Sequence, residues 1–135
     1  MARRRLLQFA PALVLFRAVP DFGNVFNVRD FGARGDGTNI DTAPINRAIA
    51  AAAASGGGTV LLPPGTYASY SIRLLSRITL HLARGATLLA ATPGTRAGDR
   101  FDPPEPVSHW ARYQDFGHDH WHDSLIWGEG LNDVT

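Results

Sequence analysis

One stretch constrains this chain more than any other: residues 30–67, DFGARGDGTNIDTAPINRAIAAAAASGGGTVLLPPGTY. A glycine-rich turn is followed there by apolar residues at the spacing i, i+3, i+4 and i+7, which predicts a helix over residues 42–54 with one apolar side. Asp41 precedes the helix, where its carboxylate could accept hydrogen bonds from the first turn, and the glycines at 56–58 end it. The apolar positions are Ile45, Ala48, Ile49 and Ala52, and we expect Ile45 and Ile49 to face inward.

Short strands are predicted after this helix. Residues 59–62 form a continuous β-prone apolar run that is too short for a helix and is bounded by glycine and proline. In residues 78–82 apolar and mostly polar residues alternate, which predicts a half-buried strand. A corner at Arg84-Gly85 leads to another short strand at 87–90. One helix followed by short strands suits a solenoid or a small β-sandwich, and periodicity alone leaves both open.

A family resemblance favours the solenoid. The segment from Phe26 to Tyr67, together with SRITLHLARGATLLA (76–90) and SLIWGEGLNDVT (124–135), resembles the opening of pectate-lyase-like proteins, in particular glycoside hydrolase family 28, the polygalacturonases. The resemblance implies a mainly β fold, a right-handed parallel β-helix. The helix would cap its N-terminal end, and only the first strands of the solenoid would be present, so that the solenoid is incomplete.

The resemblance also implies a function for a longer parent protein, namely hydrolysis of glycosidic bonds in pectin or a related uronic-acid polysaccharide. Polygalacturonase-like hydrolases carry N-T-D, D-D, G-H-G and R-I-K stretches, and none of these occurs in this sequence. We therefore expect residues 21–135 to be the N-terminal part of a β-helix domain, inactive by itself and without an assignable catalytic residue. The alternatives are a polysaccharide lyase and a non-catalytic β-helix module of a surface or tailspike-like protein.

Residues 1–20 differ in composition from the rest of the chain. Three arginines at positions 3–5 precede an apolar run from Leu6 to Phe16, which is typical of a secretory signal. Arg17 stands where a small-residue cleavage site is expected, so a disordered N-terminal extension is the alternative. We expect a secreted or periplasmic protein.

The sharpest polar feature is HDHWHD at residues 118–123, inside a long segment rich in aromatic residues and proline. In an extended chain the three histidines would point to one side, where they could ligate a metal. Contact with sugar is favoured over a metal, because tryptophan offers an apolar platform beside polar groups that fix orientation. Packing within the loop is the remaining interpretation. The candidate substrate-binding residues are His118, His120, Trp121 and His122, and neither a metal nor a cofactor is expected.

Composition excludes several partners. A formal net charge of +1 gives no basis for binding nucleic acid or a membrane surface, and the absence of cysteine excludes disulfides. Asp30, Asp36 and Asp41 lie beside glycines or before the helix, so turn and cap roles are favoured over acid–base chemistry. The last strands should expose unpaired backbone and apolar side chains, which predicts self-association. The side chains expected at this surface are Leu125, Ile126 and Leu131.

Overall fold

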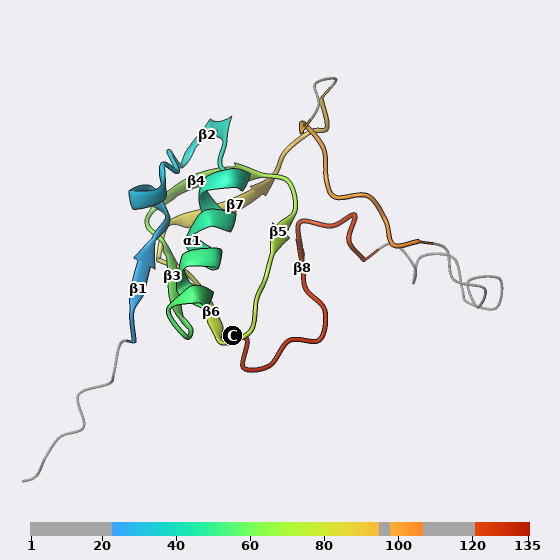
Figure 1. Ribbon diagram of the computed structural model, residues 1–135. Helices are drawn as coiled ribbons and strands as arrows, with labels where there is room; N and C mark the ends of the chain where they lie inside the picture. The colour runs from blue at the N-terminus through green and yellow to red at the C-terminus, as the bar shows by residue number, and fades with distance from the viewer. Residues whose placement is uncertain (1–22, 95–97, 107–120) are drawn as a thin grey trace, which may run out of the picture.

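The computed structural model describes residues 23–94, 98–106 and 121–135 (Figure 1). Their strands form three small sheets in which every neighbouring pair is parallel. The first sheet has the order β1 (Val25–Asn27), β3 (Gly58–Leu62), β6 (Ile78–Leu82), and the second has β2 (Asp36–Ile40), β4 (Gly65–Ser69), β7 (Ala86–Ala90). The third sheet pairs β5 (Ile72–Arg73) with β8 (Ile126–Trp127). The chain visits these faces in the same order on successive turns, which confirms the predicted right-handed parallel β-helix.

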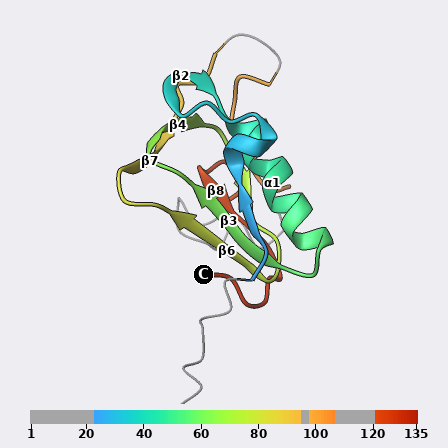
Figure 2. The ribbon, with the colours of Figure 1, turned by 90° about the vertical axis from the view of Figure 1, so that its left-hand side faces the viewer.

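The predicted helix is confirmed as α1 (Thr42–Ala54). Ile45 and Ile49 are buried, as expected, at 0% and 1% exposure. The helix packs against β1, β3 and β5 and so covers the first turn of the coil (Figures 1 and 2). Because these apolar side chains meet the inward residues of the sheets, the helix and the coil share one hydrophobic core. No helix within the described parts of the chain is both long and apolar enough to span a membrane.

The strands expected from the sequence are confirmed as β3, β6 and β7, within one residue at each end. Burial falls along β6, from Ile78, which is fully buried, to Leu82, which is 39% exposed. The apolar face predicted for β6 is therefore covered only at the N-terminal end of the strand. Five further strands and a 3₁₀ turn, η1 (Val28–Phe31), carry no clear periodicity in the sequence. The strands that sequence analysis missed are β1, β2, β4 and the two-residue pair β5 and β8.

The predicted capping role of the Asp41 side chain is wrong. Asp41 does occupy the position before α1, but its carboxylate makes no bond to the first turn of the helix. It accepts instead from the backbone N–H groups of Arg34, at 2.8 Å, and Gly35, at 2.9 Å. The physical reason is that the glycine turn folds back over the helix start and presents two donors to a carboxylate that is only 1% exposed. Asp41 therefore ties the turn to the helix.

Within the glycine turn, Asp36 has the predicted local role. Its carboxylate accepts from the backbone N–H groups of Thr38 at 3.0 Å and Asn39 at 2.8 Å, and from both side chains. These bonds hold the pKa of Asp36 far below its ordinary value. Gly35 has a φ of +64°, and a Cβ there would lie 2.9 Å from the buried Tyr67 ring, so the turn requires glycine at this position.

The expected apolar surface near the end of the chain is only partly correct. Ile126 is 41% exposed, but Leu125 and Leu131 are half-buried. The correction has a simple cause for Leu131, whose side chain folds back over Gly128: a Cβ at that glycine would meet the Leu131 side chain. Thr135 extends the first sheet, since its N–H donates to the Ile78 carbonyl at 3.1 Å and its carbonyl accepts from Leu80 at 2.8 Å.

Candidate functional site

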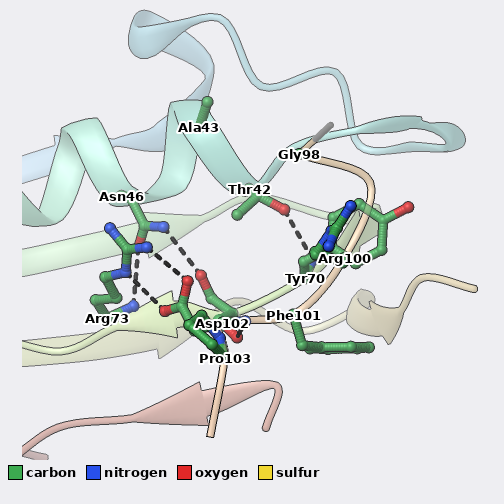
Figure 3. A pocket seen from close by; sticks show the side chains of 11 residues that line it. Thr42, Ala43, Asn46, Tyr70, Arg73, Gly98, Arg100, Phe101, Asp102 and Pro103 are labelled. Atoms are coloured by element: carbon green, nitrogen blue, oxygen red, sulfur yellow. Dashed lines mark hydrogen bonds and ion pairs between the residues drawn. The ribbon is translucent and has the colours of Figure 1, made fainter. Parts of the chain in front are cut away.

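A cleft of about 410 Å³ lies between the start of α1 and the segment 98–103, and we call it the α1 cleft (Figure 3). Its volume falls within the roughly 300–1,000 Å³ typical of small-molecule sites. Three parts of the chain line it: the first turn of α1, residues 70–73 at the start of β5, and residues 98–103. The lining residues are Thr42, Ala43, Asn46, Tyr70, Ser71, Arg73, Gly98, Arg100, Phe101, Asp102 and Pro103.

One end of the α1 cleft is a hydrogen-bonded ion pair. Arg73 donates to both carboxylate oxygens of Asp102, at 2.7 Å from Nε and 2.5 Å from Nη2. The bonds from Arg73 hold the pKa of Asp102 below its ordinary value, against a smaller opposing effect of burial, and raise the pKa of Arg73. The Arg73 side chain is 61% exposed and that of Asp102 only 16%. Asp102 is therefore the more buried partner, and the ion pair fixes segment 98–103 to β5.

The helix supplies a third polar group at this end. The Asn46 side chain donates to the Ser71 carbonyl at 3.0 Å and accepts from the Arg73 N–H at 2.9 Å. The opposite edge of β5 pairs with the β8 segment, where Ile72 donates to Leu125 at 2.9 Å. Asn46 thus satisfies the edge of β5 beside which none of the described strands lies.

The other end of the α1 cleft is aromatic. Tyr70 and Phe101 pack edge to face, with ring centroids 5.5 Å apart and planes at 90°. The Tyr70 hydroxyl donates to the Thr92 carbonyl at 3.1 Å, which fixes the ring. Arg100 lies at this end, and Figure 3 shows it on the Tyr70 and Phe101 side, away from the Arg73–Asp102 pair. Within the described ranges no carboxylate contacts Arg100, whose side chain is exposed.

A chain of contacts leads from the α1 cleft to the predicted HDHWHD motif. The Trp127 indole N–H donates to Asp102 at 2.8 Å, and its ring packs on His122, with centroids 3.9 Å apart. His122 Nε2 lies 3.0 Å from Glu129 Oε1. Segments far apart in the sequence are therefore joined by side chains that could orient one another.

The four residues predicted to contact substrate have different outcomes. His118 and His120 lie outside the described residues. Trp121 is 64% exposed, and its backbone N–H donates to Glu105 at 2.9 Å. The His122 side chain is only 20% exposed, because it packs on Trp127. Sugar contact by these residues remains a prediction.

Among the described residues, one group of side chains could hold a metal ion: Glu105, His122 and Glu129, with ligand atoms within 4.8 Å of one another. An imidazole with two carboxylates suits divalent transition metals. Partial desolvation would raise the pKa of Glu105, but bonds from backbone N–H groups and the charge of His122 outweigh it and lower that pKa. The second oxygen of Glu105 is buried without a hydrogen-bond partner. The histidine of this group belongs to the predicted motif, whereas its two glutamates were not anticipated.

Comparison with known proteins places this geometry in a family. A family model described as rhamnogalacturonase A/epimerase, pectate lyase-like matches residues 25–92, which span β1 through β7 and include α1. The chain belongs to this family. The match covers the cap helix and both larger sheets, and it confirms the resemblance inferred from residues 26–67 and 76–90.

Individual relatives agree with the family. The chain is 39% identical over 74 residues to an exo-poly-alpha-D-galacturonosidase of Dickeya chrysanthemi, covering 55% of this chain and 12% of the relative. It is 67% identical over 42 residues to mannuronan C5-epimerase AlgE3 of Azotobacter vinelandii, covering 31% and 2% respectively. A hyperthermoactive exopolygalacturonase from Thermotoga maritima has a similar structure, with a TM-score of 0.58 and 25% identity over 82% of this chain and 22% of the other. The chain thus spans a small part of the length of the relatives it matches.

Sequence reasoning missed the polar residues of the α1 cleft. Asn46 has a weak signal, as a polar residue of low helix propensity within a run of alanine and isoleucine. Arg73 and Asp102 carry none, because 29 residues separate them and no motif links them.

Proposed function

We propose that this chain forms the N-terminal part of a polygalacturonase-like glycoside hydrolase that cleaves glycosidic bonds in pectin or a related uronic-acid polysaccharide. The observation that carries the proposal is the match to the exo-poly-alpha-D-galacturonosidase, which extends over 74 residues. The family match and the similarity to an exopolygalacturonase structure support it. In this proposal residues 21–135 begin the β-helix, with α1 covering the first turn of the coil.

An epimerase is the second candidate, because the AlgE3 match has the higher identity, 67%, but over only 42 residues. A polysaccharide lyase and a non-catalytic β-helix module remain the further alternatives. The chemistry separates them. Hydrolysis creates a reducing end, elimination by a lyase creates a reducing end and an unsaturated sugar, and epimerisation exchanges the C5 hydrogen without cleaving the chain.

The catalytic residues of the proposed reaction are not assigned to this chain, since the four hydrolase motif stretches do not occur in it. In the proposal an inverting pair of carboxylates, separated widely enough to admit a water molecule, belongs to later turns of the β-helix. The 135 residues contribute the cap and the first turns. The chain alone should therefore release no reducing sugar.

The test is a reducing-end assay on polygalacturonate. It compares the purified 135-residue chain with the product of the same genomic locus extended downstream. We expect release by the extended protein only, without the ultraviolet absorbance of an unsaturated product. Release by the 135-residue chain above a buffer control would refute its inactivity. An extended protein that forms unsaturated ends would support the lyase, and one that only exchanges hydrogen in mannuronan would support the epimerase.

We further propose that residues 1–20 direct export and that the isolated chain self-associates. The first proposal rests on the basic and apolar pattern of these residues. It is tested by intact mass of the protein recovered outside the cytoplasm, which should lack the leader. The second rests on apolar side chains exposed on the outer strands β6, β7 and β8, namely Leu82, Leu89 and Ile126.

A further inference from the structure

Three side chains that can ligate a metal converge outside the α1 cleft. They are Glu105, His122 and Glu129, and their ligand atoms lie within 4.8 Å of one another. Glu105 belongs to the described segment 98–106 and the other two to segment 121–135. The His122 Nε2 atom is 3.0 Å from Glu129 Oε1. Bonds of about 2.0–2.2 Å to one tetrahedral ion place the ligand atoms about 3.4 Å apart, so side-chain shifts of about 1 Å are enough to form three bonds.

Glu105 has one carboxylate oxygen that no described residue satisfies. Its Oε1 accepts from the backbone N–H groups of Trp121, at 2.9 Å, and His122, at 3.2 Å, and these bonds fix the carboxylate. Its Oε2 is buried and has no hydrogen-bond partner within the described ranges. A buried carboxylate oxygen that is left unpaired is costly, and a bound ion is one of the partners that satisfy such a group. This oxygen therefore points to a cation, independently of the distances among the three side chains.

The imidazole of His122 is held in place from outside the group. Its ring packs on Trp127, with centroids 3.9 Å apart, and the Trp127 indole N–H donates to Asp102 at 2.8 Å. Groups that orient a ligating histidine in this way preserve the geometry of a metal site. The Glu129 side chain is 71% exposed, so an ion can reach the three ligands from solvent.

We propose that Glu105, His122 and Glu129 bind one divalent transition-metal ion, with Zn²⁺ as the ion that fits this ligand set best, and that the ion clamps segment 98–106 to segment 121–135. One imidazole nitrogen with two carboxylate oxygens suits zinc, whereas Ca²⁺ takes about six to eight oxygen ligands. His122 ligates as a neutral imidazole, so any proton that it shares with Glu129 is released to solvent. Three protein ligands leave a fourth position for water.

The proposed site differs from the metal site considered in the sequence analysis. That alternative used the three histidines of HDHWHD at residues 118–123, whereas this one uses only His122 of the motif, with one glutamate from each of the two segments. The proposal does not rest on the hydrolase assignment, because it follows from the ligand atoms alone.

The experiment is a titration of the metal-free 135-residue chain with Zn²⁺ at pH 7, in competition with a chromophoric chelator. We expect one ion per chain with a Kd of about 1 μM or below, a higher Tm with the ion bound, and at least about tenfold weaker binding of Ca²⁺. Glu105→Gln and Glu129→Gln should each weaken Zn²⁺ binding about hundredfold, because losing a group that only orients a ligand already costs about 10–100-fold. The matched control is Asp30→Asn, which removes an exposed carboxylate of η1 outside the group and should bind as the unchanged chain does.

Three results would overturn the proposal. If both glutamine variants bind Zn²⁺ as tightly as the unchanged chain, the motif histidines bind the ion without the glutamates. If Ca²⁺ binds as tightly as Zn²⁺, the imidazole is not a ligand. The third result is the absence of saturable Zn²⁺ binding. Circular dichroism of each metal-free variant separates loss of a ligand from loss of the fold, and the exposed Glu129 keeps the test available if Glu105→Gln fails to fold.

Discussion

Asn46 should stabilise the cap of the β-helix because it bonds the edge of β5 that pairs with no strand in the described parts of the chain. Its side-chain amide bonds the Ser71 carbonyl and the Arg73 N–H on the free edge of β5. Removing it in Asn46→Ala leaves the carbonyl of Ser71, a residue only 3% exposed, without a donor. An unsatisfied buried group costs about 1–3 kcal/mol. Arg73 is exposed, so water can replace the lost bond to its N–H. The helix regains roughly 0.5 kcal/mol from alanine.

The net expectation is a loss of about 1–2 kcal/mol in the free energy of unfolding. For a domain of this size that lowers Tm by about 4–8 °C per kcal/mol. The assay is thermal unfolding followed by circular dichroism at several protein concentrations. Asn46→Asp keeps an acceptor for the Arg73 N–H but turns an oxygen toward the Ser71 carbonyl, so it should destabilise at least as much as alanine.

Asn132→Ala is the matched control, because the Asn132 side chain is exposed and makes no hydrogen bond to any described residue. Its backbone N–H donates to Ser76 and its carbonyl accepts from Arg77, and alanine keeps both bonds. It should change stability by less than about 0.5 kcal/mol. The reasoning fails if Asn46→Ala and Asn46→Asp both have the same Tm as Asn132→Ala. That result would mean that water satisfies the free edge of β5 as well as the helix does.

Three further predictions concern other contacts. Asp41→Ala should cost about 2–4 kcal/mol in urea unfolding, because two backbone N–H groups of the glycine turn lose their acceptor; a loss of only about 1 kcal/mol would instead indicate a simple cap. Asp102 has a lowered pKa, so its stabilisation is present above its ordinary pKa of about 4 and is lost as pH falls through the folded value. The Asp102→Asn variant should therefore be less stable than the unchanged chain at pH 7, and its Tm should fall by less between about pH 5 and 2. Parallel curves of Tm against pH for the two proteins would contradict this. Size-exclusion chromatography should find the isolated chain above monomer size, and Ile126→Ser should reduce that fraction; a monodisperse monomer would contradict self-association.

Sequence predictions were correct for elements set by residues close together in the chain and failed for elements that depend on distant residues. Helix α1 was predicted with both ends correct, because its apolar spacing and the glycines that end it are local signals. Strand β3 was predicted from an apolar run bounded by glycine and proline, and β6 from the alternation of apolar and mostly polar residues. Strands β5 and β8 were missed: each has two residues, and they pair with each other across the segment between Arg73 and Ile126. A strand of that length exists only because a neighbour lies beside it.

Asp41 shows what the sequence decides and what only the tertiary structure decides. Its place before an apolar helix is a property of the sequence, and the structure keeps it there. Which donors its carboxylate meets depends on how the glycine turn folds back, and only the tertiary structure decides that. The α1 cleft is the same case on a larger scale, since Arg73 and Asp102 meet only when segment 98–103 returns to the coil. Local patterns thus determined the cap helix, strands β3, β6 and β7, and the family. The polar contacts of Asp41, Arg73 and Asp102 depended on partners that the coil brings together from distant parts of the chain.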